Sequence, residues 1–251
     1  MIDISTQQFK IEGRNAVIEA IRAGHDISKI LVKKGERHGT IFEIIKMAKQ
    51  AGICLQEIDG KAFENVAETR GHQGVIAIAA PVEYVSVEDI LRQADIKNED
   101  PLIYVLNEIE DPQNLGSILR TAECFGVHGV IIPKHRACGI TSTVMKVSAG
   151  AVSHVNVSRV TNIASTLDEL KQKGLWVMGA DSQGQDCFKT DLTGPVALVI
   201  GGEDKGLGRL VRQKCDLLVR IPMRGCINSL NAAVAAAILG YEITRQRVNL
   251  T

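Results

Sequence analysis

The sequence predicts an α/β protein in which a mainly parallel sheet forms a C-terminal domain and a small α/β domain precedes it. Short apolar runs alternate along the chain with segments whose apolar residues recur at helical spacing. Strands that alternate with helices favour a parallel sheet covered by helices on both faces. A polar, charged stretch that ends at Pro101 separates two such series and indicates a linker. We therefore expect domains over residues 1–81 and 101–251, joined by a linker over 82–100.

The N-terminal series begins with a helix. Residues 13–23 are expected to be helical because their apolar residues fall on one stripe, and Gly52 closes the next helical pattern. The expected strands of this series cover residues 28–34, 53–58 and 75–80, and its other expected helices cover residues 41–52 and 61–68.

The C-terminal series resumes after Pro101 with strongly apolar strands, although its middle part, after residue 133, is less regular. The expected strands cover residues 102–106, 129–133, 175–180, 196–201 and 217–222, and the expected helices cover residues 114–125, 207–214 and 229–246.

The composition is typical of a globular protein. The chain has 251 residues, of which 45% are hydrophobic, and this fraction argues against disorder. No apolar run approaches the roughly 20 residues that a membrane span needs, and the N-terminus lacks a signal-peptide core. The cysteines are scattered, without a CxxC pair or a cluster with histidine, which argues against a metal site. We expect free thiols in a reducing compartment and a cytoplasmic protein.

The charges are unevenly distributed. The chain has 29 basic and 29 acidic residues, and zero net charge argues against a nucleic-acid partner. However, the net charge is +3 over residues 1–50, −6 over 51–100 and +3 over 101–251, so neutrality is an average that does not exclude RNA. The basic residues that could contact RNA are Arg14, Lys33, Lys34 and Arg37 in the first domain, and Lys134, His135 and Arg136 after a strand.

The first candidate site is the segment NEIEDPQNLGSILRTAECFG (107–126), which follows an apolar strand. Open α/β sheets bind ligands at the carboxyl ends of their strands. Either Asp111 or Asn114 can cap the helix that follows. Arg120 lies opposite the buried stripe of this helix, where it is either a solvated side chain or a contact for an anion.

The second candidate site is VALVIGGEDKGLG (196–208), an apolar strand that runs into a glycine-rich turn carrying Glu203. Glycines let a ligand approach the backbone closely, although a purely structural turn is an equal alternative. The turn matches neither a Walker A loop nor GxGxxG, and it comes late in the chain. Both facts argue against a dinucleotide-using enzyme or a Rossmann-type methyltransferase.

The third candidate site is LLVRIPMRGCINSLNAAVAAAILGYE (217–242), in which a strand leads through a loop into an alanine-rich helix. Asn228 or Ser229 can cap this helix, and Asn231 in its first turn is expected to be a local capping group. The alanines would allow very close packing against another element.

Together, in this order and spacing, the three segments resemble the motifs of the SpoU/TrmH branch of the SPOUT RNA methyltransferases. SAGA (148–151) also resembles the branch, and EGRNAV (12–17) and HQGV (72–75) resemble its substrate-binding domain, so the resemblance covers nearly the whole chain. Within the branch, the chain is most similar to the bacterial 23S rRNA guanosine 2′-O-methyltransferases. The matching motif residues are Asn114, Gly116 and Arg120, then Gly201, Glu203 and Gly206, then Ile221, Pro222, Met223, Ser229, Leu230 and Asn231.

The resemblance implies a fold and a reaction. It implies a SPOUT domain whose C-terminal segment threads through a loop to form a deep trefoil knot, and a homodimer. It implies S-adenosylmethionine as cofactor, no metal, and methyl transfer to a ribose 2′-hydroxyl of structured RNA, with 23S rRNA guanosine favoured. The alternatives are a tRNA substrate, or a non-catalytic RNA-binding or ribosome-assembly protein of the same fold.

The resemblance also implies site residues. Arg120 would lie at the nucleophile, as a base or as a phosphate clamp, and the clamp is the easier role because a guanidinium stays protonated. The chain departs from the family pattern at Gly202, Asp204 and Ala233, which bears on substrate contacts rather than on the reaction. The implied catalytic residues are Arg120, Asn114, Glu203, Ser229 and Asn231, and the implied cofactor contacts are Gly201, Gly206, Ile221, Met223 and Leu230.

Overall fold

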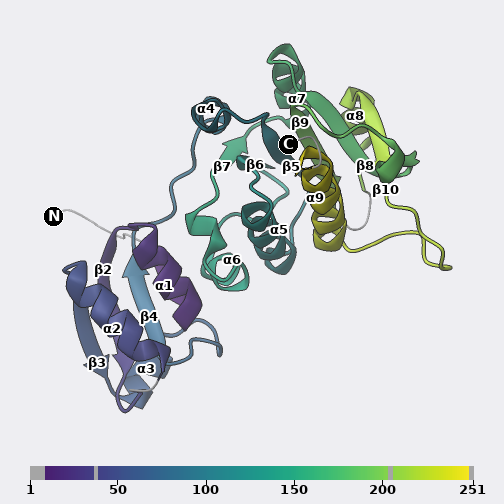
Figure 1. Cartoon of the computed structure of the whole chain (residues 1–251). Helices are drawn as coiled ribbons and strands as arrows, with labels where there is room; N and C mark the ends of the chain where they lie inside the picture. The colour runs from purple at the N-terminus through teal and green to yellow at the C-terminus, as the bar shows by residue number, and fades with distance from the viewer. Residues whose placement is uncertain (1–8, 37–38, 203–205, 249–251) are drawn as a thin grey trace. The chain divides into compact units, whose positions relative to one another are not determined.

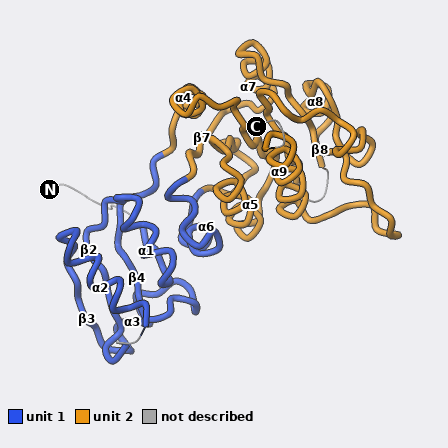
Figure 2. The backbone as a smooth tube through the Cα atoms, in the orientation of Figure 1, with its two compact units in different colours: residues 1–83, 140–154 blue, residues 84–139, 155–251 orange. Residues whose placement is uncertain are grey.

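The computed structural model describes residues 9–36, 39–202 and 206–248. The chain divides into two compact units (Figure 2). Unit 1 comprises residues 1–83 and 140–154, and unit 2 comprises residues 84–139 and 155–251.

Unit 1 is built on a four-stranded mixed sheet with the strand order β1-β4-β2-β3. Strand β4 is antiparallel to β1 and β2, whereas β2 and β3 are parallel. Every residue of β4 is buried, as its uninterrupted apolar sequence requires. The elements are β1 (Phe9–Glu12), α1 (Arg14–Arg22), β2 (Ile27–Lys33), α2 (Thr40–Gln50), β3 (Cys54–Ile58), α3 (Gly60–Val66), β4 (Val75–Ala79), α6 (Ser142–Val147) and the 3₁₀ helix η1 (Ala151–Ser153).

The segment 140–154 was expected in the C-terminal domain, but it groups with unit 1. Helix α6 packs on β1, and Lys146 Nζ donates a hydrogen bond to Thr69 Oγ1 at 3.0 Å. Thr69 is in turn held by Glu12, a fully buried carboxylate that accepts bonds from the Thr69 N–H at 2.9 Å and the Glu68 N–H at 2.6 Å. The glutamate of the EGRNAV segment is therefore a structural anchor for the loop after α3.

Unit 2 contains a six-stranded sheet with the order β10-β8-β9-β5-β6-β7, in which every neighbouring pair is parallel (Figure 1). The predicted α/β class with a mainly parallel sheet is confirmed. The strands are β5 (Leu102–Asn107), β6 (Gly129–Pro133), β7 (Val157–Val160), β8 (Trp176–Asp186), β9 (Val196–Gly201) and β10 (Leu217–Arg220). The helices are α4 (Val87–Lys97), α5 (Pro112–Cys124), α7 (Ile163–Gln172), η2 (Cys187–Lys189), α8 (Arg209–Lys214) and α9 (Ala232–Val248).

Helices cover both faces of this sheet because side chains alternate along each strand. Ile103 and Val105 of β5 share one core cluster with residues of α4, α7 and α8. Tyr104, between them, faces the other side, where its hydroxyl donates to the Ala236 carbonyl of α9 at 3.2 Å. A Cβ at Gly240 would lie 1.8 Å from that hydroxyl, so α9 can approach the sheet only with glycine there. Helix α5 packs against α9 on this face (Figure 1).

The structure differs from the prediction around residues 82–100. Helix α4 occupies most of the expected linker, begins with a capping box at Ser86 and Asp89, and buries Ile90 completely in the core of unit 2. The charged residues that suggested a linker form the exposed side of this helix. Strands β1 and β7 and helices α6 and α7 were also not predicted.

The structure selects one of the two caps proposed for α5 and replaces both caps proposed for α9. Asp111, with Pro112 at the first helical position, caps α5, because its side chain accepts a bond from the Gln113 N–H at 2.9 Å. Helix α9 begins only at Ala232, and its cap is Asn231, not Asn228 or Ser229. The role of Asn231 as a local capping group is therefore confirmed.

Candidate functional site

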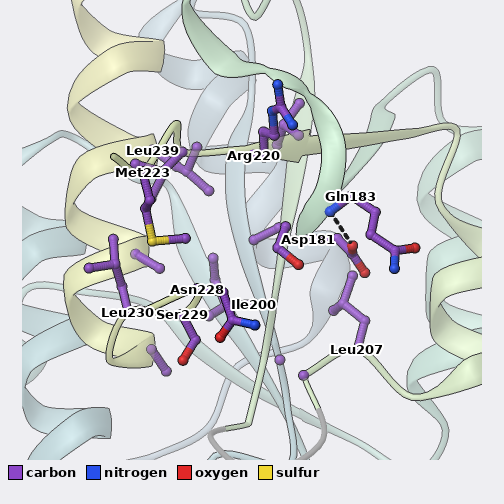
Figure 3. Close-up of a pocket in the computed structure, with 18 of the residues that line it drawn as sticks. Asp181, Gln183, Ile200, Leu207, Arg220, Met223, Asn228, Ser229, Leu230 and Leu239 are labelled. Atoms are coloured by element: carbon purple, nitrogen blue, oxygen red, sulfur yellow. Dashed lines mark hydrogen bonds between the residues drawn. The ribbon is translucent and has the colours of Figure 1, made fainter. Parts of the chain in front are cut away.

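A pocket of about 460 Å³ lies where β9 and β10 end, beside the start of α9 (Figure 3). It receives residues from five segments: the middle of β8, the end of β9, the turn after β9 with α8, β10 with the loop that follows it, and α9. All five residues expected to contact the cofactor line it, namely Gly201, Gly206, Ile221, Met223 and Leu230. The carboxyl-end position is the one that open α/β sheets use for ligands.

The glycines of the second motif are needed for backbone packing. A Cβ at Gly201 would lie 2.1 Å from the Gly206 carbonyl carbon, and a Cβ at Gly202 would lie 2.4 Å from the Glu108 carbonyl oxygen. Gly206 has a φ of +58°, which favours glycine, and its N–H donates to the Gly202 carbonyl at 3.0 Å. This chain therefore requires glycine at position 202, where the family pattern often has Ser or Ala. Glu203 and Asp204 lie outside the described residues.

Apolar side chains form one wall of the pocket. Ile200 and Leu239 are almost completely buried, whereas Met223 and Leu230 are 37% and 39% exposed at its rim (Figure 3). Such a wall suits an aromatic ring or an aliphatic chain, because apolar contact needs no fixed partner.

Polar residues of β8 form the opposite wall. Asp181 accepts a hydrogen bond from the Gln183 N–H at 2.8 Å and lies 3.4 Å from Nη1 of Arg212 (Figure 3). Arg212 Nη2 also donates to Gln183 Oε1 at 2.9 Å. At the rim, Arg220 Nε donates to Asp186 Oδ1 at 2.6 Å, and this hydrogen bond lowers the pKa of Asp186. The wall thus presents preorganised ionic groups to a polar ligand.

Sequence reasoning missed Asp181, Gln183, Arg212 and Arg220. The available signal was the polar run DSQGQD, which directly follows an apolar strand sequence. In the structure this run continues β8 to Asp186 rather than forming a loop, and Arg212 comes from α8, so their proximity depends on tertiary packing.

Asn114 and Asn231, 117 residues apart, are in direct contact. Asn231 Nδ2 donates to Asn114 Oδ1 at 2.8 Å, and Asn231 Oδ1 accepts from the N–H groups of Ala233 and Val234 at 2.9 and 3.3 Å. Asn114 is buried and Ala233 is buried in the first turn of α9. The two asparagines of the first and third motifs therefore join the starts of α5 and α9, although neither lines the pocket.

Arg120 is exposed on α5 and does not line the pocket either. It lies six positions after Asn114, which on an α-helix is about 120° of rotation and about 9 Å along the axis. Within the described ranges, no carboxylate lies within 4 Å of its guanidinium. Ser229, by contrast, lines the pocket (Figure 3). Within one chain, the pocket thus brings together Ser229 and the five residues expected to contact the cofactor, but Arg120 is not among its lining residues.

The basic residues considered for RNA binding differ in their partners. Arg14 pairs with Glu36 at 3.1 Å and Lys33 with Glu64 at 2.8 Å, while Lys34 is exposed and Arg37 lies outside the described residues.

The described residues hold no group of three or more His, Cys, Asp or Glu placed to bind a metal ion. None of the helices in the described ranges combines the length and the apolar character that crossing a membrane requires.

The chain is similar to known proteins over nearly its whole length. Residues 101–241 match the SpoU rRNA Methylase family, and residues 10–85 match the RNA 2′-O ribose methyltransferase substrate-binding family. The Bacillus subtilis protein YacO, assigned to the TrmH family of tRNA/rRNA methyltransferases, is 45% identical over 245 residues, which is 97% of this chain and 98% of YacO. A Staphylococcus haemolyticus protein assigned to the same family is 46% identical over 96% of this chain and 97% of its own length.

Solved structures show the same likeness. The SpoU methyltransferase AviRb from Streptomyces viridochromogenes, in complex with AdoMet, has a TM-score of 0.80 and 26% identity, covering 96% of this chain and 91% of its own. An AdoMet-bound rRNA methyltransferase from Sinorhizobium meliloti has a TM-score of 0.77 and 26% identity, covering 96% and 88%. The matched families and these relatives show that the chain belongs to the SpoU/TrmH family of RNA methyltransferases, which use S-adenosylmethionine.

Proposed function

We propose that the protein transfers a methyl group from S-adenosylmethionine to a ribose 2′-hydroxyl of structured RNA, with a guanosine of 23S rRNA as the favoured target. The observation that carries the proposal is the pocket, in which the residues of the second and third motifs meet at the carboxyl edge of a parallel sheet. The family of the N-terminal residues, which is named for RNA 2′-O ribose methylation, supports the choice of hydroxyl.

The pocket fits the proposed cofactor. Gly201 and Gly206 pack backbone against backbone and both line the pocket, so no side chain from either residue stands between their peptide groups and an adenine ring. Ile200, Leu239 and Met223 offer apolar contact to the ring and to the aliphatic carbons beside the sulfonium, and the Asp181 wall offers ionic partners for the charged amino-acid end. When bound, S-adenosylmethionine supplies an electrophilic methyl group on a sulfonium.

The protein's part in the reaction is alignment and charge stabilisation. Arg120 stays protonated, so we assign it the role of holding an RNA phosphate and stabilising the negative charge that develops on the attacking 2′-oxygen. Asn114 and Asn231 are positioning residues, because their mutual hydrogen bond orients the starts of α5 and α9. Ser229, on the pocket rim, and Glu203 are assigned to the target nucleotide and its loops.

We also assign the active form to a homodimer with a trefoil knot at the C-terminus, as the family resemblance implies. Helix α9 supports the dimer because apolar residues occur around its whole circumference. Leu239 and Ile243 are buried, but Val234, Ile238 and Tyr241 are 45%, 37% and 57% exposed. A second copy that covers this outer face could supply Arg120 to the pocket of its partner.

A tRNA substrate is the second candidate, and the extent of the structural matches weighs against it. The tRNA-modifying TrmH/SpoU enzyme of A. aeolicus covers 60% of this chain, at a TM-score of 0.54 and 26% identity. The AdoMet-bound rRNA methyltransferase that matches covers 96%. The N-terminal unit therefore favours rRNA.

The deciding experiment maps 2′-O-methylation across total RNA from cells with and without the gene. We expect one 23S rRNA guanosine to lose its methyl group, and the site to be restored by the wild-type protein but not by Arg120→Ala. Loss at a tRNA position would select the second candidate. Loss at no site would favour a non-catalytic RNA-binding or ribosome-assembly protein.

A further inference from the structure

A second hollow, of about 530 Å³, lies at the β7 edge of the sheet in unit 2, outside the cofactor pocket. It is formed by the segment before α4, the loop after β6, and β7. Its lining residues are Tyr84, Val85, Ser86, Lys134, His135 and Arg159. The function proposed above leaves this hollow unused.

Backbone contacts hold the walls of the hollow in place. The Val85 N–H donates to the Val157 carbonyl at 2.9 Å, so the chain at Tyr84 runs along β7 as an extra edge segment. The Arg159 guanidinium lies 5.0 Å from the centre of the Tyr84 ring, and its Nη2 donates to the Lys134 carbonyl at 3.1 Å. The guanidinium is therefore fixed between a ring and a carbonyl before any ligand arrives.

The hollow is basic in a chain that has no net charge. Its lining includes two cationic side chains, Lys134 and Arg159, together with His135, and no acidic side chain. In the described part of the chain, Lys134, His135 and Arg159 have no carboxylate within 4 Å, whereas the adjacent Arg136 pairs with Glu108 at 3.4 Å. The Ser86 hydroxyl is already used, because it donates to Asp89 Oδ2 at 2.6 Å. The groups that remain for a ligand are the Lys134 ammonium, the planar Arg159 guanidinium and the His135 ring.

This combination matches one ligand chemistry best. A planar guanidinium on a tyrosine ring is a surface on which a nucleobase can stack, and a lysine beside it attracts phosphate. An acidic peptide would use the charges but not the stacking surface. We propose that this hollow binds a nucleotide of the RNA substrate away from the methylated one, with a base on Arg159 and a phosphate at Lys134. The proposal rests on the function proposed above.

The position of the hollow suits a continuous RNA strand. Lys134 and His135 follow the end of β6, Arg159 lies near the end of β7, and Gly201 ends β9 at the cofactor pocket. Three strand spacings separate β9 from β7 in the sheet order, which is about 14 Å. A single strand of RNA covers this distance in a few nucleotides, along the edge where all strands end.

The test measures binding of a fluorescein-labelled (U)12 oligoribonucleotide to the full chain over a range of salt concentrations. We expect Arg159→Ala and Lys134→Ala each to weaken binding by roughly tenfold and to lower the slope of log K against log salt by about 0.7. Arg159→Lys should weaken binding but keep the slope, because it removes the stacking plane and retains the charge. The matched controls are Arg92→Ala and Lys97→Ala on α4, which should change neither quantity appreciably.

Three results would overturn the proposal. They are wild-type affinity in Arg159→Ala and Lys134→Ala, equal weakening in the α4 controls, or binding of uridine monophosphate as tight as that of the oligonucleotide. S-adenosylmethionine affinity, measured in parallel, should be unchanged in all variants and confirms folding. Failure of the proposed function would show differently, as a wild-type protein that binds the oligonucleotide through this hollow but methylates no RNA.

Discussion

Adding a single methyl group at Gly201 tests whether the pocket requires glycine at this position. Gly201→Ala places Cβ 2.1 Å from the Gly206 backbone, so β9 and the turn before α8 must separate and the pocket must open. We expect S-adenosylmethionine binding, measured by isothermal titration calorimetry, to weaken at least tenfold. The control is Gly194→Ala, where no atom lies within 4 Å of the added Cβ and φ is not positive. Unchanged affinity in Gly201→Ala would contradict the assigned role.

The role of Arg120 can also be tested with one substitution. Because Arg120 does not line the pocket, Arg120→Ala should bind S-adenosylmethionine as the wild type does. Transfer of labelled methyl to RNA should fall by roughly 10²–10³-fold, as for other groups that stabilise developing negative charge. Arg92→Ala, an exposed arginine on α4, controls for the lost charge. Full transfer activity in Arg120→Ala would rule out the clamp.

The sequence was a good guide to some residues and a poor guide to others. The motifs named six residues that line one pocket, because glycines and a strand end leave a local pattern. Asp181 and Arg212 were missed, since a polar residue inside a strand and an arginine on a short helix have no such pattern. Their relation is visible only after β8 and α8 have packed.

The starts of α5 and α9 should depend on Asn231 in two ways. Asn231→Ala removes the cap of α9, at a cost of about 1 kcal/mol, and leaves the buried Asn114 oxygen unpaired, at a cost of about 1–3 kcal/mol. Urea unfolding should therefore show a larger loss than for Asn162→Ala, which removes only the cap of α7. Asn231→Asp keeps the oxygen that caps α9, so it should show only the stability loss that comes from the unpaired Asn114 oxygen. Equal losses in Asn231→Ala and Asn162→Ala would contradict this coupling.

The junction of β5 and β6 should be sensitive to acid. His128 is buried, and its Nδ1 accepts a hydrogen bond from the Leu102 N–H at 3.0 Å, which requires an unprotonated Nδ1. Burial lowers the pKa of His128, and Lys97 lowers it further, although Glu99 opposes both. The folded state therefore binds fewer protons than the unfolded state, and stability is lost as pH falls below the unfolded value of about 6.5.

The measurement is the urea-unfolding free energy of wild type and His128→Asn between pH 8 and pH 5. The asparagine oxygen can accept from Leu102 without titrating, so the variant should lose less stability over this interval. Burial also lowers the pKa of His25. Both proteins contain His25, so its contribution to the pH dependence cancels in the comparison. Parallel stability curves would exclude His128 as the sensitive group.

At the scale of elements, strongly periodic segments were predictable and irregular ones were not. The apolar runs at β5 and β9 could be read directly, because strands buried on both faces have no polar positions. Helix α4 was interpreted as a linker because charged residues on its exposed side dominate its sequence, while only Val87, Ile90 and Ala94 are buried and Leu91 is partly buried. The place of α6 in unit 1 depends on contacts with distant residues, which no local pattern records.

At the scale of the whole molecule, α9 exposes an apolar surface that the proposed dimer would bury. The small residues of α9 allowed us to predict close packing, and its inner face packs on α5 and Tyr104. Its outer face exposes Ile238 and Tyr241, and the pocket lacks Arg120 within one chain. Ile238→Asp should therefore give a monomer by light scattering and lose methyl transfer, because burying an unpaired carboxylate in an interface is costly. Ile96→Asp, at an exposed apolar residue of α4, should leave the mass and activity unchanged.

A mixing experiment tests whether two chains share one active site. Arg120→Ala keeps an intact pocket and lacks the arginine, whereas Gly201→Ala keeps the arginine and lacks the pocket. If Arg120 of one copy serves the pocket of the other, each mixed dimer contains one site with both wild-type parts. Co-refolding the two impaired variants should therefore raise methyl transfer well above the level that either variant shows alone. A wild-type protein that is a fully active monomer, or mixed dimers without activity, would show that Arg120 does not act across a dimer interface.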